Sequence, residues 1–256
     1  DFINDIDGPE SCNTNNMLKL TEDLHRRNPE ARYADYYELA TFNHILSTQH
    51  PEHGGYVYFT PARPRHYRNY SAPNEAMWCC VGTGMENHGK YGQFIYTHAG
   101  DALFVNLYAA SQLDWKERGI TLRQETAFPY SENSTITIAE GKGTFNLMVR
   151  YPGWVHPGEF KVSVNGKPAD IITGPSSYVS INRKWKKGDV VKVGTKIAEA
   201  GGFVSAPIFS SVSGKVNKVD TVIDASGYRK PAIFIDVEGD EWEETIDRST
   251  ELVKDC

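Results

Sequence analysis

Long apolar runs, a surplus of basic residues and a basic-then-apolar leader are all missing from this 256-residue sequence. Because no stretch approaches 18 consecutive apolar residues, we expect no transmembrane helix. The formal net charge of −6 argues against nucleic-acid binding, which needs a basic stripe. The chain opens at Asp1, which is no translational start, and the sequence alone indicates neither export nor retention.

Cysteine is scarce, and its four positions, 12, 79, 80 and 256, include no Cys-x-x-Cys pair. In a chain of this length such spacing does not indicate a disulfide framework. The adjacent residues Cys79 and Cys80 bond poorly to each other, because the ring that they would close strains the peptide between them. Two thiols on one turn serve better as metal ligands, or as a ligand beside a nucleophile.

A third thiol, Cys12, follows the carboxylate of Glu10 by two residues. One carboxylate oxygen and three thiolates are enough to complete a tetrahedral zinc shell. The alternative is three buried free cysteines, since cysteine is among the most buried residue types. The spacing leaves both interpretations open.

Composition changes along the chain. Residues 194–256 hold seven Lys/Arg and twelve Asp/Glu, so most of the negative charge lies there, whereas all eight histidines lie before residue 180. The acidic run 236–247 is most simply a solvated edge or linker. This step predicts two unrelated pieces joined in one chain.

The first hundred residues predict helices. Apolar spacing indicates one helix over 14–27, and Asn28 with Pro29 is expected to cap a second helix that ends near Ser47. A short strand over 56–60 and a loop over 61–74 follow, and a helix is expected from Cys79 to near Gly100. Its glycines at 82, 84, 89 and 92 predict close approach of backbone or ligand. Cys79 and Cys80 at its start favour thiolates.

From residue 102 to 193 the apolar pattern has period two, and short strands with regular turns predict a β-sandwich. Asn165-Gly166 is a strong hairpin signal. Trp154, in a Tyr-Pro-Gly-Trp sequence, is interpreted as a core or edge aromatic rather than a platform for sugars.

Several motifs resemble bacterial β-L-arabinofuranosidases of glycoside hydrolase families 127 and 146, with family 146 the closer. They are Glu10-Ser11-Cys12-Asn13-Thr14, His50-Pro51-Glu52-His53-Gly54-Gly55, Tyr58-Phe59-Thr60-Pro61 and the run from Met77 to Asn87 around Cys79-Cys80. The likeness covers about residues 5–190. It implies the C-terminal helices of an (α/α)₆ barrel over 1–101 and a β-sandwich over 102–190.

The resemblance implies that Cys79 attacks the anomeric carbon and that Glu10, Cys12, Cys79 and Cys80 hold zinc. A zinc-bound thiol loses its proton at neutral pH, which suits a nucleophile. The implied partners are arabinofuranose-containing plant glycans or glycoproteins. In that family the acid/base glutamate lies upstream of the Glu-x-Cys motif, and no glutamate precedes Glu10 here. We therefore expect impaired hydrolysis.

Residues from about 188 to 256 resemble a biotinyl/lipoyl-like barrel-sandwich module, more specifically the C subunit of the ion-translocating ferredoxin:NAD electron transport complex. Val193 to Pro207 and Ser213 to Val216 carry this likeness. Gly202 stands where carrier members have the modified lysine, so we expect a module over 191–256 without a covalent cofactor. Cys256 alone cannot hold an iron–sulfur cluster.

The two resemblances meet at residues 185–193, and either a genuine fusion or two assembly contigs spliced at a shared Lys-Gly-Asp turn accounts for the join. Three functions stay open: a zinc–cysteine glycosidase, a non-catalytic electron-transport module, and a carbohydrate-binding sandwich with structural cysteines. The first implies a periplasmic or secreted protein and the second a cytoplasmic membrane-associated one.

Overall fold

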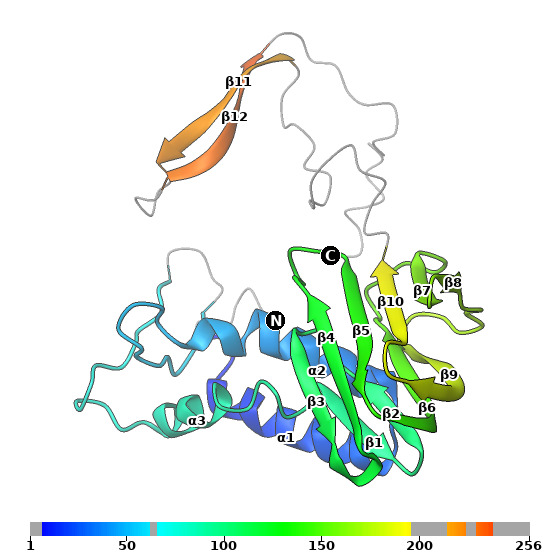
Figure 1. The fold of residues 1–256 in the computed structure, drawn as a ribbon. Helices are drawn as coiled ribbons and strands as arrows, with labels where there is room; N and C mark the ends of the chain where they lie inside the picture. The colour runs from blue at the N-terminus through cyan, green and yellow to red at the C-terminus, as the bar shows by residue number, and fades with distance from the viewer. Residues whose placement is uncertain (1–6, 62–65, 196–213, 224–228, 238–256) are drawn as a thin grey trace, which may run out of the picture. The chain divides into compact units, whose positions relative to one another are not determined.

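The computed structural model describes residues 7–61, 66–195, 214–223 and 229–237. The chain divides into two compact units, residues 1–199 and residues 200–256. In the first unit three α-helices precede two β-sheets, so the mixed α+β class expected from the sequence is confirmed (Figure 1). Within the described part of the chain, no helix has the length and apolarity needed to cross a membrane.

Helices α1 (Ser11–Arg27) and α2 (Ala31–Asn43) form the predicted helical hairpin. The predicted capping of the second helix was wrong. The Asn28 backbone N–H donates to the Leu24 carbonyl at 2.9 Å and ends α1 instead, and Glu30 is the residue that precedes α2. Pro29 therefore lies between the helices rather than at the first helical position.

The second helix also ends earlier than the predicted Ser47. His44 leaves the helical conformation, and a 3₁₀ turn, η1 (Ile45–Thr48), follows. The His44 ring lies between two hydroxyls, with Nδ1 2.7 Å from Thr14 Oγ1 and Nε2 2.8 Å from Thr60 Oγ1. These contacts with distant segments fix His44 outside the helix.

Helix α3 (Cys79–Asn87) begins at the cysteine pair as predicted but ends well before Gly100. Of the glycines at 82, 84, 89 and 92, close approach explains Gly84, where a Cβ atom would lie 2.4 Å from the Tyr56 ring, whereas Gly82 and Gly92 face open space. The strand predicted over 56–60 is reduced to isolated bridges, Gln49 with Tyr56, Val57 with Tyr70 and Glu10 with Phe59.

The period-two region forms two sheets. One has the order β1 (Tyr96–Ala99), β2 (Ala102–Val105), β6 (Lys142–Tyr151), β9 (Ser177–Lys186). The other has the order β3 (Ser111–Trp115), β4 (Ile120–Thr126), β5 (Asn133–Glu140), β10 (Val190–Thr195), β7 (Phe160–Val164), β8 (Lys167–Pro168). The 3₁₀ turn η2 (Lys116–Arg118) joins β3 to β4. Side chains from both sheets share one core, among them Leu147, Trp185, Ile136 and Val191.

The turn between β7 and β8 confirms the hairpin signal. Asn165 and Gly166 have φ of 52° and 78°, the two positive values that a type I′ turn requires. Strand β10 lies between β5 and β7 in the middle of its sheet. The sandwich therefore extends through Thr195, past the expected boundary at residue 190, and it begins with β1 at Tyr96, before residue 102.

Arg150 on β6 joins the helices to the sandwich. Its side chain is fully buried, with Nη1 2.5 Å from Asp35 Oδ1 on α2 and Nη2 paired with Glu38 on the same helix. Its Nε donates to the Asn106 carbonyl at 2.5 Å. The Trp154 indole N–H donates to Glu38 Oε1 at 2.8 Å, so Trp154 is an edge aromatic at this contact.

In the second unit the described residues form an antiparallel pair, β11 (Gly214–Ile223) and β12 (Arg229–Val237). Val216 and Val219, two of the valines expected in the barrel-sandwich module, lie in β11. Gly202 and Cys256 lie outside the described residues. The complete module stays a prediction.

Candidate metal centre

A short antiparallel pairing places Glu10 beside Tyr58. The Ser11 N–H donates to the Tyr58 carbonyl and the Thr60 N–H to the Pro9 carbonyl, both at 3.1 Å. Gly8 permits this contact: its φ is +74°, and a Cβ atom there would lie 2.4 Å from the Thr60 carbonyl oxygen. Helix α1 starts immediately after Glu10, so the carboxylate and Cys12 stand at the same helix end.

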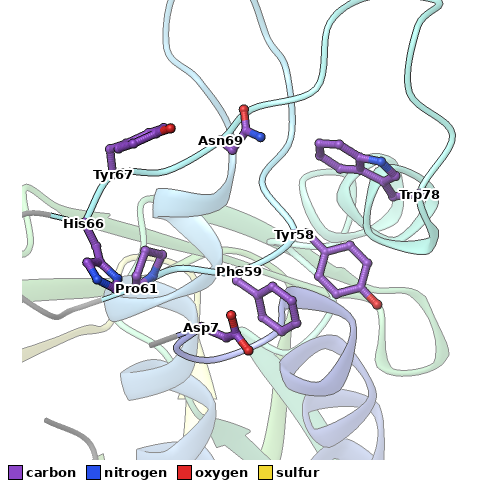
Figure 2. Close-up of a pocket in the computed structure, with 8 residues that line it drawn as sticks. All are labelled: Asp7, Tyr58, Phe59, Pro61, His66, Tyr67, Asn69 and Trp78. Atoms are coloured by element: carbon purple, nitrogen blue, oxygen red, sulfur yellow. The ribbon is translucent and has the colours of Figure 1, made fainter. Parts of the chain in front are cut away.

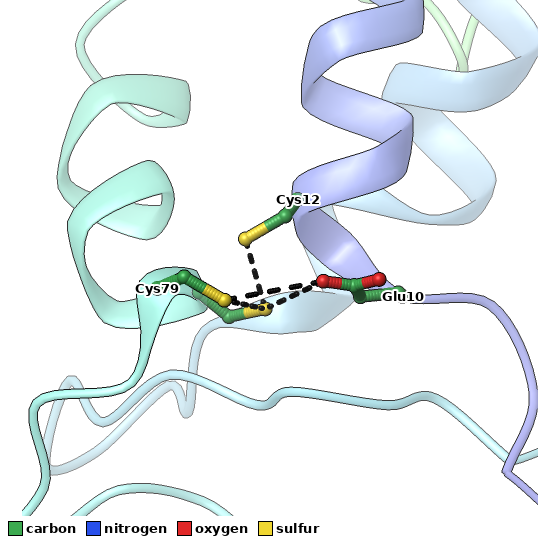
Figure 3. A group of neighbouring side chains, drawn as sticks. Glu10, Cys12 and Cys79 are labelled. Atoms are coloured by element: carbon green, nitrogen blue, oxygen red, sulfur yellow. Dashed lines mark hydrogen bonds between the residues drawn. The ribbon is translucent and has the colours of Figure 1, made fainter.

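The structure brings together all four residues that the sequence suggested as ligands. Glu10, Cys12, Cys79 and Cys80 offer one carboxylate oxygen and three sulfurs that all lie within 4.8 Å of one another (Figure 3). The Cys80 sulfur lies 3.1 Å from that of Cys12 and 3.9 Å from that of Cys79. Glu10 Oε1 lies 4.0 Å from the Cys79 sulfur and 3.9 Å from the Cys80 sulfur.

The separation of the two neighbouring sulfurs on α3 matches that of two ligands of one small cation. Zn–S bonds of about 2.3 Å at tetrahedral angles place two sulfurs about 3.8 Å apart, close to the Cys79–Cys80 distance. Three thiolates with one carboxylate are a donor set suited to zinc, whereas magnesium and calcium prefer oxygen ligands alone. The donor set therefore fits zinc, whereas the Cys12–Cys80 sulfur separation of 3.1 Å is shorter than that expected for two zinc-bound sulfurs.

Burial and the neighbouring thiols disfavour the thiolate of Cys12 unless a cation is present. Burial and the neighbouring Cys80 and Cys79 thiols raise the pKa of Cys12 to about 12, although the Thr83 hydroxyl opposes the shift. Because a thiol must lose its proton to bind a metal, a bound cation would supply the missing positive charge and release protons. The half-buried Cys12 and the buried Cys80 are thus suited to ligation rather than to reaction with external molecules.

Cys79 differs from the other two thiols. It is exposed, and its sulfur lies 3.6 Å from the Tyr58 hydroxyl oxygen. Hydrogen bonding with Tyr58, and then with Cys12, lowers the pKa of Cys79. Its place as the first residue of α3 adds the partial positive charge of a helix N-terminus. Cys79 is therefore the exposed thiol of this group, and the one whose pKa is lowered.

An open hollow of about 440 Å³ adjoins the cluster. Tyr58 connects the two, since it lines the hollow while its hydroxyl oxygen lies 3.6 Å from the Cys79 sulfur. Figure 2 shows the lining side chains: Asp7, Tyr58, Phe59, Pro61, His66, Tyr67, Asn69 and Trp78. Aromatic faces among a few polar groups are the usual lining of a site for a small polar ligand with an apolar face.

Two neighbours of the cluster were missed from the sequence. Tyr58 lies in one of the resembling motifs but had no role assigned to it, and its contact with Cys79 depends on the pairing with residues 9–11. Thr83 Oγ1 lies 3.2 Å from the Cys12 sulfur. The sequence could have indicated this contact, because Thr83 lies four residues after Cys79 and residues at that spacing share a helix face.

Two curated relatives are C subunits of ion-translocating oxidoreductases. The chain is 35% identical over 111 residues to the C subunit of the Na(+)-translocating ferredoxin:NAD(+) oxidoreductase complex of Acetobacterium woodii, covering 43% of this chain and 20% of that protein. It is 34% identical over 119 residues to the proton-translocating counterpart of Clostridium ljungdahlii, covering 40% of this chain and 25% of that protein. The chain thus spans at most a quarter of these relatives, and their activity is not carried over.

Solved structures point to the other resemblance. A glycoside hydrolase and a GH127 β-arabinofuranosidase are each 27% identical, with TM-scores of 0.63 and 0.64, and the match covers 73% of this chain and 32% of theirs. A GH127 β-L-arabinofuranosidase from Geobacillus stearothermophilus T6, 24% identical with a TM-score of 0.63, supports the fold, and its match covers 91% of this chain and 37% of that enzyme. The chain spans about a third of these enzymes.

Two family models match consecutive parts of the chain. Residues 1–93 match the catalytic domain of β-L-arabinofuranosidase GH127, and residues 102–197 match the middle domain of the same family. The closer likeness to family 146 stays a prediction. Residues 1–93 and 102–197 therefore belong to the GH127 family of β-L-arabinofuranosidases.

Proposed function

We propose that the first unit acts in a zinc-dependent retaining glycoside hydrolase that cleaves β-L-arabinofuranosides, with Cys79 as the nucleophile. The observation that carries this proposal is the convergence of one carboxylate and three thiols beside an aromatic hollow. Arabinofuranose-containing plant glycans or glycoproteins are the proposed substrates.

In this proposal Glu10, Cys12, Cys79 and Cys80 hold the zinc, which keeps the Cys79 sulfur deprotonated at neutral pH. Cys79 attacks the anomeric carbon, so that a C–S bond forms as the bond to the leaving oxygen breaks. Water then displaces the sulfur and restores the anomeric configuration. Tyr58, 3.6 Å from the Cys79 sulfur, orients the nucleophile, and the aromatic lining of the hollow holds the sugar.

The leaving oxygen also needs a proton. General acid catalysis is typically worth about 10²–10⁴-fold, and the donor in retaining glycosidases is a carboxylic acid. The resemblance implies a glutamate upstream of the Glu-x-Cys motif as this donor, whereas the carboxylic acid among the described residues that line the hollow is Asp7, on a shorter side chain. We therefore propose that this chain by itself hydrolyses alkyl glycosides slowly, while substrates with an acidic aryl leaving group, which needs little protonation, depend less on the missing acid.

Labelling with an electrophilic arabinofuranose analogue tests the proposal. A zinc-loaded chain should carry one label on Cys79, and Cys79→Ser should carry none. The matched control is Cys256→Ser, which removes the one cysteine that is not among the proposed ligands and should leave labelling unchanged. Less than about 0.2 zinc per chain after metal-replete folding, together with no label on Cys79, contradicts the proposal, since thiolate-rich sites bind zinc tightly.

A second candidate function concerns the tail. The match to C subunits of ferredoxin:NAD(+) oxidoreductase complexes supports a non-catalytic module of such a complex in this chain, and the motif resemblance leads us to propose about residues 188–256 for it. Pull-down with the other subunits of a bacterial complex of this type tests it, and retention that does not depend on residues 196–256 counts against it.

A further inference from the structure

His44, at the end of α2, joins the two segments that carry the metal centre. The residue is buried, with Nδ1 2.7 Å from Thr14 Oγ1 near the start of α1 and Nε2 2.8 Å from Thr60 Oγ1. Both threonines belong to motifs that carry the family resemblance, and the proposed function gives neither of them a role. The histidine therefore connects the Glu-x-Cys segment with residues 58–60.

The hydrogen bonds determine which ring nitrogen carries the proton. The Thr60 hydroxyl lies 3.2 Å from the Pro9 carbonyl oxygen, which can only accept, so this hydroxyl donates there. It must then accept from His44 Nε2–H, while the unprotonated Nδ1 accepts from the Thr14 hydroxyl. Burial, and then the positive charge of Arg68, lower the pKa of His44, which keeps the ring neutral. This series of hydrogen bonds from Thr14 through His44 and Thr60 to Pro9, called here the His44 clamp, runs in one direction, so that each bond polarises the next.

The His44 clamp ends on the short pairing that places Glu10. The Pro9 carbonyl also accepts from the Thr60 backbone N–H at 3.1 Å, and the Ser11 N–H donates to the Tyr58 carbonyl at 3.1 Å. Glu10, between these two hydrogen bonds, supplies the carboxylate of the candidate metal centre. Tyr58 contacts the thiol cluster through its hydroxyl. A shift of one segment against the other would therefore move both groups.

Two replacements separate the hydrogen bonds of the ring from its volume. Phenylalanine at position 44 would fill the space but neither donate nor accept, so the hydroxyls of Thr14 and Thr60 would each lose a partner. Glutamine carries one acceptor and one donor on a single amide, as the neutral imidazole does on its ring, and can replace both bonds. The two variants are thus expected to behave differently at the metal centre.

We propose that His44 is a positioning residue of the metal centre. In its neutral Nε2–H tautomer it holds the Glu-x-Cys segment against residues 58–60, and it thereby keeps the Glu10 carboxylate where a zinc ion needs it. The importance of this position for zinc rests on the proposed function, whereas the His44 clamp itself does not. Loss of a group that orients a metal ligand typically weakens metal binding about 10–100-fold.

The first test measures the zinc affinity of the full chain under reducing conditions, by competition with a chromophoric chelator. His44→Phe should weaken zinc binding at least about ten-fold, and His44→Gln should keep an affinity close to that of the parent. The matched control is His25→Phe, which removes another buried histidine of the helical hairpin, whose Nε2 lies 2.9 Å from the Tyr178 hydroxyl. It should lower the melting temperature and leave zinc affinity unchanged.

Amide hydrogen exchange of the metal-free chain is the second test and needs neither zinc nor turnover. In His44→Phe the protection of the Ser11 and Thr60 amides should fall at least about ten-fold, whereas the amides that pair β6 with β9 should keep theirs. The ¹⁵N shifts of the His44 ring in the parent should be those of a neutral imidazole protonated at Nε2. Thr14→Val, which removes only the donor to Nδ1, should also weaken zinc binding and replaces His44→Phe if that variant does not fold.

Three results overturn the proposal. One is a zinc affinity of His44→Phe equal to that of the parent, which would make the histidine a structural residue alone. The second is equal protection of the Ser11 and Thr60 amides in both proteins. The third is a ring protonated at Nδ1 in the parent. A parent that binds no zinc contradicts the proposed function instead, and the exchange and ring measurements then decide for or against the His44 clamp by themselves.

Discussion

Replacing Arg150 by methionine tests the buried contact between α2 and the sandwich. The Arg150 side chain is 0% exposed, and those of its partners Asp35 and Glu38 are 19% and 8% exposed. Methionine fills much of the same volume but leaves two carboxylates without a counter-charge. Breaking a buried ion pair in this way costs about 3–5 kcal/mol, a large part of the roughly 5–15 kcal/mol that stabilises a typical domain.

Urea unfolding followed by tryptophan fluorescence measures this cost. In a chain that also carries Asp35→Asn and Glu38→Gln, Arg150→Met should lower the free energy of unfolding by at least about 2 kcal/mol less than it does in the parent. The reason is that no buried carboxylate is then left without a counter-charge. The matched control is Arg183→Met. The Arg183 side chain is 36% exposed and lies 3.7 Å from the buried Asp189, whose carboxylate also accepts hydrogen bonds from Asn165 and the Lys186 N–H, so the change should cost less than about 1 kcal/mol. If Arg150→Met costs no more than this control, the reasoning about uncompensated buried charge is refuted.

Three further predictions concern metal, protons and the tail. Cys80→Ser should lower the zinc content, and a chelator should no longer lower the melting temperature as it does in the parent. Cys256→Ser should behave like the parent. Equal zinc content in both variants contradicts the ligand assignment. Burial lowers the pKa of His25 from 6.5 to about 4. As pH falls, the unfolded chain therefore takes up a proton before the folded chain does. The contribution of neutral His25 to the free energy of unfolding is complete above pH 6.5 and is lost between pH 6.5 and pH 4. We expect about 2 kcal/mol of this loss between pH 7 and pH 5. His25→Gln should remove the loss, whereas the control His156→Gln, at an exposed position, should keep it. If the free energy of unfolding of His25→Gln falls with pH as in the parent, this histidine is excluded as the cause. Expression with biotin and lipoate ligases should leave the intact mass unmodified, because glycine at position 202 has no amine to acylate, and a biotin or lipoate adduct mapped within residues 194–220 contradicts the interpretation of the module.

Local patterns predicted much of the fold and the candidate ligands. The alternation over 102–193 predicted the strands, and Asn165-Gly166 predicted its hairpin because the turn depends only on residues next to it. The candidate ligand set came from motif resemblance; its four residues lie close together in the structure, and their role as ligands stays a prediction.

Features that depend on distant contacts were not predictable in the same way. His44 ends α2 because Thr14 and Thr60 hold its ring, and neither residue is near it in sequence. Tyr58 reaches Cys79 only because residues 58–60 pair with residues 9–11. Helical spacing carries no information about such pairings, so the hollow and the true helix end required the structure.

The position of β10 sets the order in which the sandwich is completed. The β7–β8 hairpin has no other partner in its sheet, and β5 keeps an unpaired edge, until residues 190–195 insert between them. Pairing of this kind joins segments far apart in sequence and is slow to form. During synthesis the sheet therefore closes late, with its open edges exposed to association meanwhile. Any sequence joined to this domain near residue 190 must itself supply a strand that completes the sheet.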